Sequence, residues 1–284
     1  MIKILRLEQW SKNLVILLPP LFANRIELLL DKNLLIIFLG FSIIASSTYI
    51  FNDLKDLDQD RLHPTKKNRP LPKGDISVKN AKKYGLILYI FGCCLVYIAN
   101  NYAIIFVLAY SLITVLYSEF FKYRKYFDFC LITILFGVRL FLGSYVTEIA
   151  LTNTLSLFTL TTINLIILSK KMSIFNDPEI NLKVRVKSHL VKNYTVAELK
   201  IYYFLSSSAS ILILLIWTIQ WFELGLAYIF LSILNFFSLC LFNYRLYQDA
   251  FKSETEDFIS WLRVSKIIYL FIFSGLSVFT LLYL

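Results

Sequence analysis

Long apolar stretches recur along the whole chain and leave little room for anything else. They fall at residues 13–30, 34–51, 84–99, 102–120, 127–147, 154–170, 200–219, 222–243 and 263–284. Most are close to the roughly 20 apolar residues that an α-helix needs to cross a bilayer. Of the 284 residues, 58% are hydrophobic and 17% are charged, whereas soluble domains are about half apolar and about a quarter charged. The sequence therefore predicts an all-α integral membrane protein of about nine transmembrane helices, in a single domain over residues 1–284.

Two adjacent prolines, Pro19 and Pro20, interrupt the first apolar stretch. Proline has no backbone N–H and breaks a helix interior, so an arrangement that omits this stretch as a span stays open. The prolines, with no small-residue cleavage site after them, also argue against a signal peptide. The four cysteines lie in or beside apolar stretches without metal-ligand spacing, which is typical of small buried residues.

Basic residues fall almost entirely on one side of this arrangement. With a cytoplasmic N-terminus and nine alternating spans, 26 of the 29 Lys and Arg residues lie in segments 1–12, 52–83, 121–126, 170–200 and 244–266. Cytoplasmic loops carry the excess of Lys and Arg in membrane proteins, so this side should face the cytoplasm. The net charge of +10 is then concentrated over one face, where it suits anionic lipid or an anionic substrate.

Four aspartates follow the second apolar stretch, within residues 52–60 (NDLKDLDQD). If the helix continues, Asp53, Asp56 and Asp60 share one face, because they are three and seven residues apart. Carboxylates this close need neutralising cations, and aspartates at a helix C-terminus also oppose the helix dipole. Mg²⁺ fits, since it binds one or two carboxylates and bridges to substrate phosphates. The plainer alternative, a solvated acidic helix end, leaves this costly arrangement unexplained, and we favour the metal site.

A basic, proline-punctuated segment follows immediately. Its charged or titratable residues are Arg61, His63, Lys66, Lys67, Arg69 and Lys73. Arg gives forked contacts to phosphate and Lys a point charge, so an acidic cluster followed by a basic one suits a metal–diphosphate site with a second anion pocket. Taken alone, the basic segment is more typical of an ordinary cytoplasmic loop. The residues by themselves indicate a membrane enzyme that handles a phosphorylated substrate with a divalent metal.

The motif Asn52-Asp53-x-x-Asp56-x-x-x-Asp60 resembles the first aspartate-rich motif of the UbiA superfamily of membrane prenyltransferases, whose fold has nine helices around a central cavity. The continuation His63-Pro64-Thr65-Lys66-x-x-Arg69-Pro70 resembles the branch that transfers phosphoribose to a polyprenyl phosphate, the decaprenyl-phosphate phosphoribosyltransferases. Further segments are similar to that branch: Gln9-Trp10-Ser11-Lys12-Asn13, Tyr117 to Lys122, Asp128 with Arg139-x-x-x-Gly143, Lys170-Lys171, and Glu254-x-Glu256-Asp257. The resemblance runs along nearly the whole chain.

This resemblance implies Mg²⁺-dependent transfer of 5-phosphoribose from phosphoribosyl diphosphate to a polyprenyl phosphate, in cell-envelope biosynthesis. It assigns Asp53, Asp56 and Asp60 as catalytic and metal-binding residues. Substrate binding is expected from Lys12, Asn52, His63, Lys66, Arg69, Tyr117, Lys122, Asp128, Arg139, Lys170 and Lys171. The expected partners are these two substrates and membrane lipid, not nucleic acid, and a homo-oligomer is left open. The expected location is the inner membrane of a bacterium, with the active site facing the cytoplasm.

The sequence departs from the family pattern at two places. Quinone-type members carry a second motif, Asp-x-x-x-Asp, after the sixth helix, and residues 170–179 lack it. In the phosphoribosyl branch a Glu follows the basic pair, where this chain has Ile174. The missing motif and the basic segment count against the alternative enzyme, which moves a prenyl group from a prenyl diphosphate to an aromatic or other lipophilic acceptor. A transporter or lipid-binding protein would not need three carboxylates at one interface.

Arg139 lies about twelve residues, or roughly 18 Å, into its predicted span, where a charge is costly. Asp128 is three helical turns earlier and on the same side of the helix. We expect both side chains to line a polar cavity, with Arg139 meeting a substrate phosphate. The alternative is a structural contact between Arg139 and a carboxylate or carbonyl groups on another helix.

Overall fold

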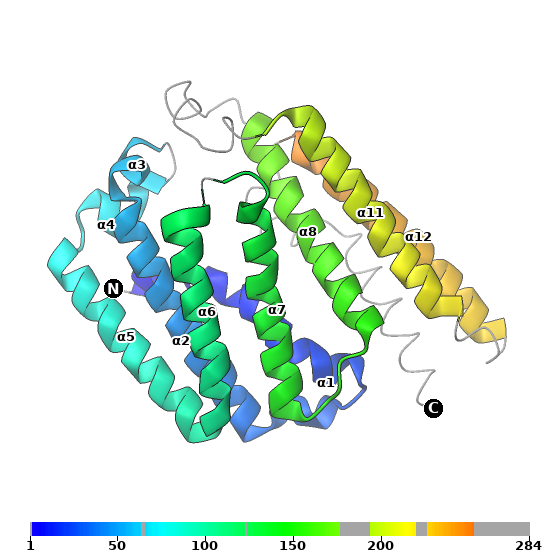
Figure 1. Ribbon diagram of the computed structural model, residues 1–284, viewed down its shortest axis with the longest axis horizontal. Helices are drawn as coiled ribbons and strands as arrows, with labels where there is room; N and C mark the ends of the chain where they lie inside the picture. The colour runs from blue at the N-terminus through cyan, green and yellow to red at the C-terminus, as the bar shows by residue number, and fades with distance from the viewer. Residues whose placement is uncertain (1, 64–65, 123, 177–193, 220–225, 253–284) are drawn as a thin grey trace. The chain divides into compact units, whose positions relative to one another are not determined.

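The structure, a computed structural model, is helical in nearly all of the chain that it describes (Figure 1). The described residues are 2–63, 66–122, 124–176, 194–219 and 226–252. Contacts group the described residues into two compact units, one up to Ala150 and one from Leu151 onward. The single domain over residues 1–284 stays a prediction.

Seven helices in these ranges are long and apolar enough to cross a membrane. The first unit contains α2 (Lys32–Lys55), α5 (Val78–Ala99), α6 (Ile104–Leu116) between η5 (Asn101–Ala103) and the π-helical turn η6 (Tyr117–Phe121), and α7 (Phe127–Thr147). The second contains α8 (Asn153–Asn176), α11 (Val196–Ile219) and α12 (Leu226–Phe251). They coincide with the second to eighth predicted stretches and confirm an all-α, multi-pass membrane protein. The ninth stretch, residues 263–284, lies outside the described residues.

The first predicted stretch, residues 13–30, does not form one regular span. It contains the end of a 3-10 helix, η2 (Leu7–Leu17), then α1 (Leu18–Phe22) and a further 3-10 helix, η3 (Ile26–Leu30). Pro19 and Pro20 account for the change, because they cannot donate to the carbonyl groups one helical turn earlier but are tolerated in the first turn of a new helix. The regular spans therefore begin with α2.

In the first unit, α2 and α5 lie side by side (Figure 1). Gly40 and Gly92 permit this close approach, because a Cβ at Gly92 would lie only 2.7 Å from the carbonyl oxygen of Gly40. Small residues take this role between transmembrane helices, which associate through close packing. Ile37, Phe41 and Ile44 of α2 are fully buried in the resulting core.

The N-terminal segment, residues 2–17, consists of η1 (Ile2–Leu5) and η2 and packs against α2 and α7. The buried Asn13 donates a hydrogen bond from Nδ2 to Ser42 Oγ of α2 at 3.0 Å. On the other side, Ile16 meets Gly143 of α7 so closely that a Cβ at Gly143 would lie 2.0 Å from the Ile16 carbonyl oxygen. The segment is thus packed into the first unit through Asn13 and Ile16, although it is not a regular span.

Gly143→Ala should destabilise the protein by about 2–3 kcal/mol or more, because overpacking against a backbone atom forces α7 and η2 apart. The measurement is thermal unfolding of the purified protein in detergent. Gly85→Ala is the matched control, since its new Cβ would meet the ring of Phe51 at 3.1 Å, and a side chain can shift. Equal unfolding temperatures for the two variants would contradict the close packing at Ile16.

The second unit combines apolar packing with hydrogen bonds between α11 and α12. The buried Tyr203 of α11 donates a hydrogen bond to the carbonyl oxygen of Asn243 in α12 (2.6 Å). The side chain of Asn243 donates in turn to Ser207 Oγ (2.9 Å). Both bonds satisfy polar atoms that are costly to leave unpaired inside a membrane protein.

Candidate functional site

The acidic motif lies at the end of α2, where the helix is interrupted at one residue. Asp53 belongs to the last turn of α2, Asp56 is the interruption, and Asp60 belongs to α3 (Leu57–Leu62). The backbone stays close to helical, because the N–H of Asp56 donates to the Asn52 carbonyl oxygen (2.9 Å) and that of Asp60 to the Asp56 carbonyl oxygen (2.8 Å). The helix predicted through this motif is therefore present, with a break at its centre.

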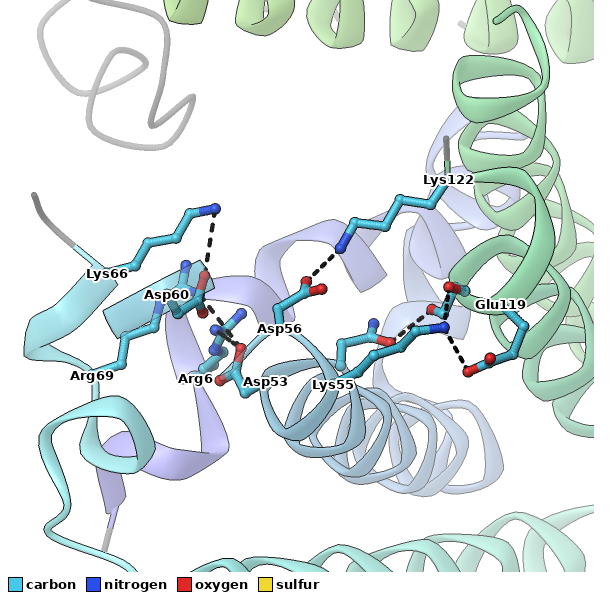
Figure 2. A network of polar contacts seen from close by, with 11 residues as sticks. Arg6, Asp53, Lys55, Asp56, Asp60, Lys66, Arg69, Glu119 and Lys122 are labelled. Carbon is cyan, nitrogen blue, oxygen red and sulfur yellow. Dashed lines mark hydrogen bonds and ion pairs between the residues drawn. The ribbon is translucent and has the colours of Figure 1, made fainter. Parts of the chain in front are cut away.

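Asp53 and Asp60 are brought together by one guanidinium group (Figure 2). Arg69 Nη1 lies 2.8 Å from Asp60 Oδ2 and 3.4 Å from Asp53 Oδ1. Arg6 of the N-terminal segment also pairs with Asp53, and Lys66 Nζ lies 3.9 Å from Asp60 Oδ1. Three cations therefore surround two carboxylates, and one of these, Asp60, is only 3% exposed. The basic segment meets the acidic motif directly.

Asp56 faces away from this pair, toward the end of α6 (Figure 2). Its carboxylate pairs with Lys122, the residue after η6. Beside it, the side-chain oxygen of Asn52 accepts a hydrogen bond from Ser118 Oγ at 2.8 Å. These contacts tie the acidic motif to a second predicted segment, Tyr117 to Lys122.

The three aspartates do not converge on one point in this structure. Within the described ranges, no three acidic, histidine or cysteine side chains form a group that could hold a metal ion. Asp53 and Asp60 still suit Mg²⁺ as a pair, because they reach the same nitrogen of Arg69 and Mg²⁺ needs only one or two carboxylates beside substrate phosphates. Asp56 as a third ligand stays a prediction, and it requires that carboxylate to leave Lys122.

Short helices fold the basic segment back toward Asp60. They are η4 (Lys66–Asn68) and α4 (Pro70–Lys73), and the backbone N–H of Lys66 donates to His63 Nδ1 at 3.4 Å. Burial lowers the pKa of Lys66 below its ordinary value, although the nearby Asp60 carboxylate acts in the opposite direction. An added anion would favour the charged ammonium group, so Lys66 is suited to contact a phosphate.

Three other predicted site residues of the first unit have contacts other than those with Asp53 and Asp60. Lys12 Nζ lies 5.5 Å from the centre of the Tyr49 ring. Tyr117 begins η6, and its carbonyl oxygen accepts a hydrogen bond from the N–H of Lys122 (2.7 Å). Asp128 lies in the first turn of α7, where its carboxylate accepts from the next backbone N–H (2.7 Å). Contacts of these side chains with substrate stay predictions.

Lys170 and Lys171 lie on α8, in the second unit. Lys170 is exposed, whereas Lys171 is 8% exposed with its Nζ 4.5 Å from the centre of the Tyr194 ring. Ile174 follows on the same helix. The phosphate-binding role of the basic pair stays a prediction, and residues 254–257 lie outside the described residues.

Arg139 is 3% exposed in the middle of α7. Its Nε donates to Asn13 Oδ1 (2.8 Å) and its Nη1 to the carbonyl oxygen of Leu135 (2.7 Å). Its Nη2 donates to the Tyr110 hydroxyl (3.3 Å), whose ring lies 4.8 Å from the guanidinium carbon. No carboxylate pairs with it within the described ranges. These contacts favour the structural alternative, because Asn13 and Tyr110 on other helices and the Leu135 carbonyl one turn earlier on α7 accept from the guanidinium group. Contact with a substrate phosphate stays a prediction.

Arg6 is a site residue that the sequence does not single out. It lies between η1 and η2 with a left-handed backbone (φ 48°, ψ 54°), and it pairs with Asp53, 47 positions later. The only local signal is a basic residue shortly before Gln9-Trp10, and such residues are ordinary beside the cytoplasmic end of a span. Only the packing of the N-terminal segment on α2 brings Arg6 to the acidic motif.

Residues 16–282 match the family model described as the UbiA prenyltransferase family. The chain belongs to this family. The match confirms the resemblance of the acidic motif and identifies the protein as a UbiA-type membrane enzyme. A transporter or a simple lipid-binding protein no longer fits.

Relatives of this UbiA protein include decaprenyl-phosphate phosphoribosyltransferase of Mycobacterium tuberculosis, 23% identical over 252 residues that cover 83% of this chain and 81% of that protein. Digeranylgeranylglyceryl phosphate synthase of Methanocaldococcus jannaschii is 36% identical over 106 residues, 37% of this chain and 36% of that protein. A solved UbiA homologue from Archaeoglobus fulgidus, bound to GPP and Mg²⁺, covers 98% of both chains with a TM-score of 0.70 at 16% identity. One alignment with a further relative spans only 28% of that relative's length.

The solved homologue confirms the UbiA fold over nearly the whole chain. The phosphoribosyltransferase relative confirms the predicted likeness to that branch at the level of distant similarity. A divalent metal is bound by the solved family member, in keeping with the suitability of Asp53 and Asp60 as a carboxylate pair in this chain.

Proposed function

We propose that this UbiA-type enzyme transfers 5-phosphoribose from phosphoribosyl diphosphate to a polyprenyl phosphate, at the cytoplasmic face of a bacterial inner membrane. The observation that carries the proposal is the surplus of cations at the acidic motif, where Arg6, Arg69 and Lys66 surround Asp53 and Asp60. A donor with a diphosphate and a separate phosphate supplies more negative charge than a prenyl diphosphate. The long, distant alignment with a decaprenyl-phosphate phosphoribosyltransferase supports the same branch.

Mg²⁺ is the cofactor that we propose, with Asp53 and Asp60 as its carboxylate ligands. When bound, it would neutralise the charge that develops on the leaving diphosphate. Arg69 contacts both carboxylates through one nitrogen, which leaves the rest of its guanidinium fork for phosphate oxygens. Lys66 adds a point charge beside Asp60. The residues of this site therefore bind and orient the donor.

The acceptor supplies its own nucleophile in this reaction. A phosphate monoester has a second pKa of about 6, so a polyprenyl phosphate is largely a dianion at neutral pH. Its oxygen forms a bond to the anomeric carbon of the ribose, the bond from that carbon to the diphosphate breaks, and diphosphate leaves with the electron pair. No proton has to be removed, so the protein contributes positioning and charge neutralisation rather than a general base.

A second candidate function is transfer of a prenyl group from a prenyl diphosphate to a lipophilic acceptor. The local identity with digeranylgeranylglyceryl phosphate synthase and the fold shared with a GPP-bound homologue favour it. Such a donor has no phosphate apart from its diphosphate. It would therefore use fewer of the cations that surround Asp53 and Asp60.

Membranes that carry the full chain distinguish these functions. We expect label from ribose-labelled phosphoribosyl diphosphate to enter the lipid fraction when polyprenyl phosphate and Mg²⁺ are present, and to stay in the aqueous phase when a chelator replaces Mg²⁺. A parallel reaction contains labelled prenyl diphosphate with an aromatic or glyceryl-lipid acceptor. Label in lipid only in the parallel reaction would reject the phosphoribosyl function in favour of the second candidate.

A further inference from the structure

A cavity of about 340 Å³ lies beside Asp53, between the N-terminal segment and the basic segment. This volume is at the low end of the range for small-molecule sites, which suits a phosphorylated sugar better than a long lipid. The polar side chains that line it, besides Asp53, are Lys3, Arg6, Glu8, Gln9, Asn68 and Arg69. The cavity thus adjoins the proposed diphosphate site through Asp53 and Arg69.

The cations of this cavity outnumber its anions. Arg6 and Arg69 both contact Asp53, so a single carboxylate is shared by two guanidinium groups. Lys3 is exposed and forms no ion pair within the described ranges, and Glu8 is exposed as well. The surplus positive charge is suited to an anion that enters from solution.

Arg6 has donors to spare for such an anion. Among the described residues, only its Nη2 has a hydrogen-bond acceptor, whereas a guanidinium group carries five N–H donors in a fork that matches phosphate. Its backbone has φ 48°, a left-handed conformation that residues other than glycine rarely adopt. Strained residues of this kind collect at ligand sites, and here η1 and η2 fix the conformation from both sides.

We propose that this cavity binds the 5-phosphate of the donor, with Lys3 and Arg6 as its recognition residues and Arg69 shared with the diphosphate. The inference rests on the proposed function, because the donor of that reaction carries a phosphoryl group apart from the leaving diphosphate and therefore needs a second anion site. It gives the N-terminal segment a role in specificity. A prenyl diphosphate has no group that would fill this cavity.

The test uses the purified full chain in detergent, titrated calorimetrically with ribose 5-phosphate and, separately, with diphosphate plus Mg²⁺. We expect the wild type to bind both. Lys3→Gln should lower the affinity for ribose 5-phosphate roughly tenfold, through loss of one charge-assisted contact. It should change the affinity for diphosphate by less than about threefold. Arg6→Lys keeps the charge but loses the fork, and should act in the same direction. Lys82→Gln, at an exposed position of α5 outside the cavity, controls for the change in net charge.

Equal affinities of the wild type and Lys3→Gln for ribose 5-phosphate would overturn the inference, and so would an equal loss in Lys82→Gln. A wild type that binds diphosphate but not ribose 5-phosphate would also overturn it. If Arg6→Lys lowers the affinity for both ligands through its contact with Asp53, the Lys3→Gln result decides whether the inference holds. Failure of the proposed function is distinguishable, because the wild type would then transfer no phosphoribosyl label to lipid, whatever its affinity for ribose 5-phosphate.

Discussion

Asp60→Asn should slow phosphoribosyl transfer by about a hundredfold or more, the scale on which removal of one electrostatic contact to a reacting group acts. Asp60 is 3% exposed, and its two oxygens face Arg69 and Lys66. An asparagine in its place keeps the shape but removes the charge that balances both cations and would bind Mg²⁺. The measurement is the initial rate at which ribose label enters lipid at saturating Mg²⁺.

Asp58→Asn is the control for Asp60→Asn, since it makes the same substitution in the same motif on a side chain that is 96% exposed. Its rate should stay within about twofold of wild type, as exposed substitutions generally have small effects. A second readout is binding of Mn²⁺ in the presence of diphosphate, followed by electron paramagnetic resonance. If Asp60→Asn matched Asp58→Asn in both rate and bound Mn²⁺, Asp60 would have no place in the site.

Arg139→Met should destabilise the protein by about 3 kcal/mol, because it removes the charged donor and leaves the buried Asn13 oxygen and Tyr110 hydroxyl without it. Burying a charge in a membrane protein is costly, which acts in the opposite direction. Each of its three guanidinium nitrogens donates to an acceptor, so we expect the lost contacts to decide the sign. The measurement is thermal unfolding in detergent.

Arg124→Met, on an exposed arginine before α7, should leave the unfolding temperature unchanged and serves as the matched control. The Arg139 variant also separates the two interpretations of that residue. A structural role lowers the unfolding temperature. If Arg139→Met instead unfolds like wild type while its KM for polyprenyl phosphate or phosphoribosyl diphosphate rises, the guanidinium group contacts substrate.

The spans were predictable because the bilayer imposes one simple requirement, a sufficiently long apolar helix. The first stretch meets this requirement by composition, but Pro19 and Pro20 remove two backbone donors and the chain restarts as α1. Apolar composition shows that the stretch is long enough to cross a bilayer. Whether it forms one regular helix depends on its backbone hydrogen bonds. The break between η2 and α1 in this stretch therefore follows from two residues.

The composition of the site was predictable, but the partner of each carboxylate was not. Asp60 and Arg69 are nine positions apart, so their contact follows from local folding of the basic segment. The pairs of Asp53 with Arg6 and of Asp56 with Lys122 span 47 and 66 positions, and both depend on which helices pack together. Helical periodicity predicted the three aspartates on one face, whereas in the structure the Asp56 carboxylate pairs with Lys122, away from Asp53 and Asp60.

The contact between Asn13 and Arg139 also has a consequence for biosynthesis, because these residues are 126 positions apart. Ribosomes add about 5–20 residues per second, so the N-terminal segment is complete for roughly 6–25 seconds before its partner on α7 exists. During that time α2, α5 and α6 are synthesised. The N-terminal segment cannot yet pack between α2 and α7, because α7 has not been made. The segment that carries Arg6 is thus made before α7 and takes its final packing only after α7 has been made, so a nascent chain acquires its acidic motif well before it acquires a finished anion site.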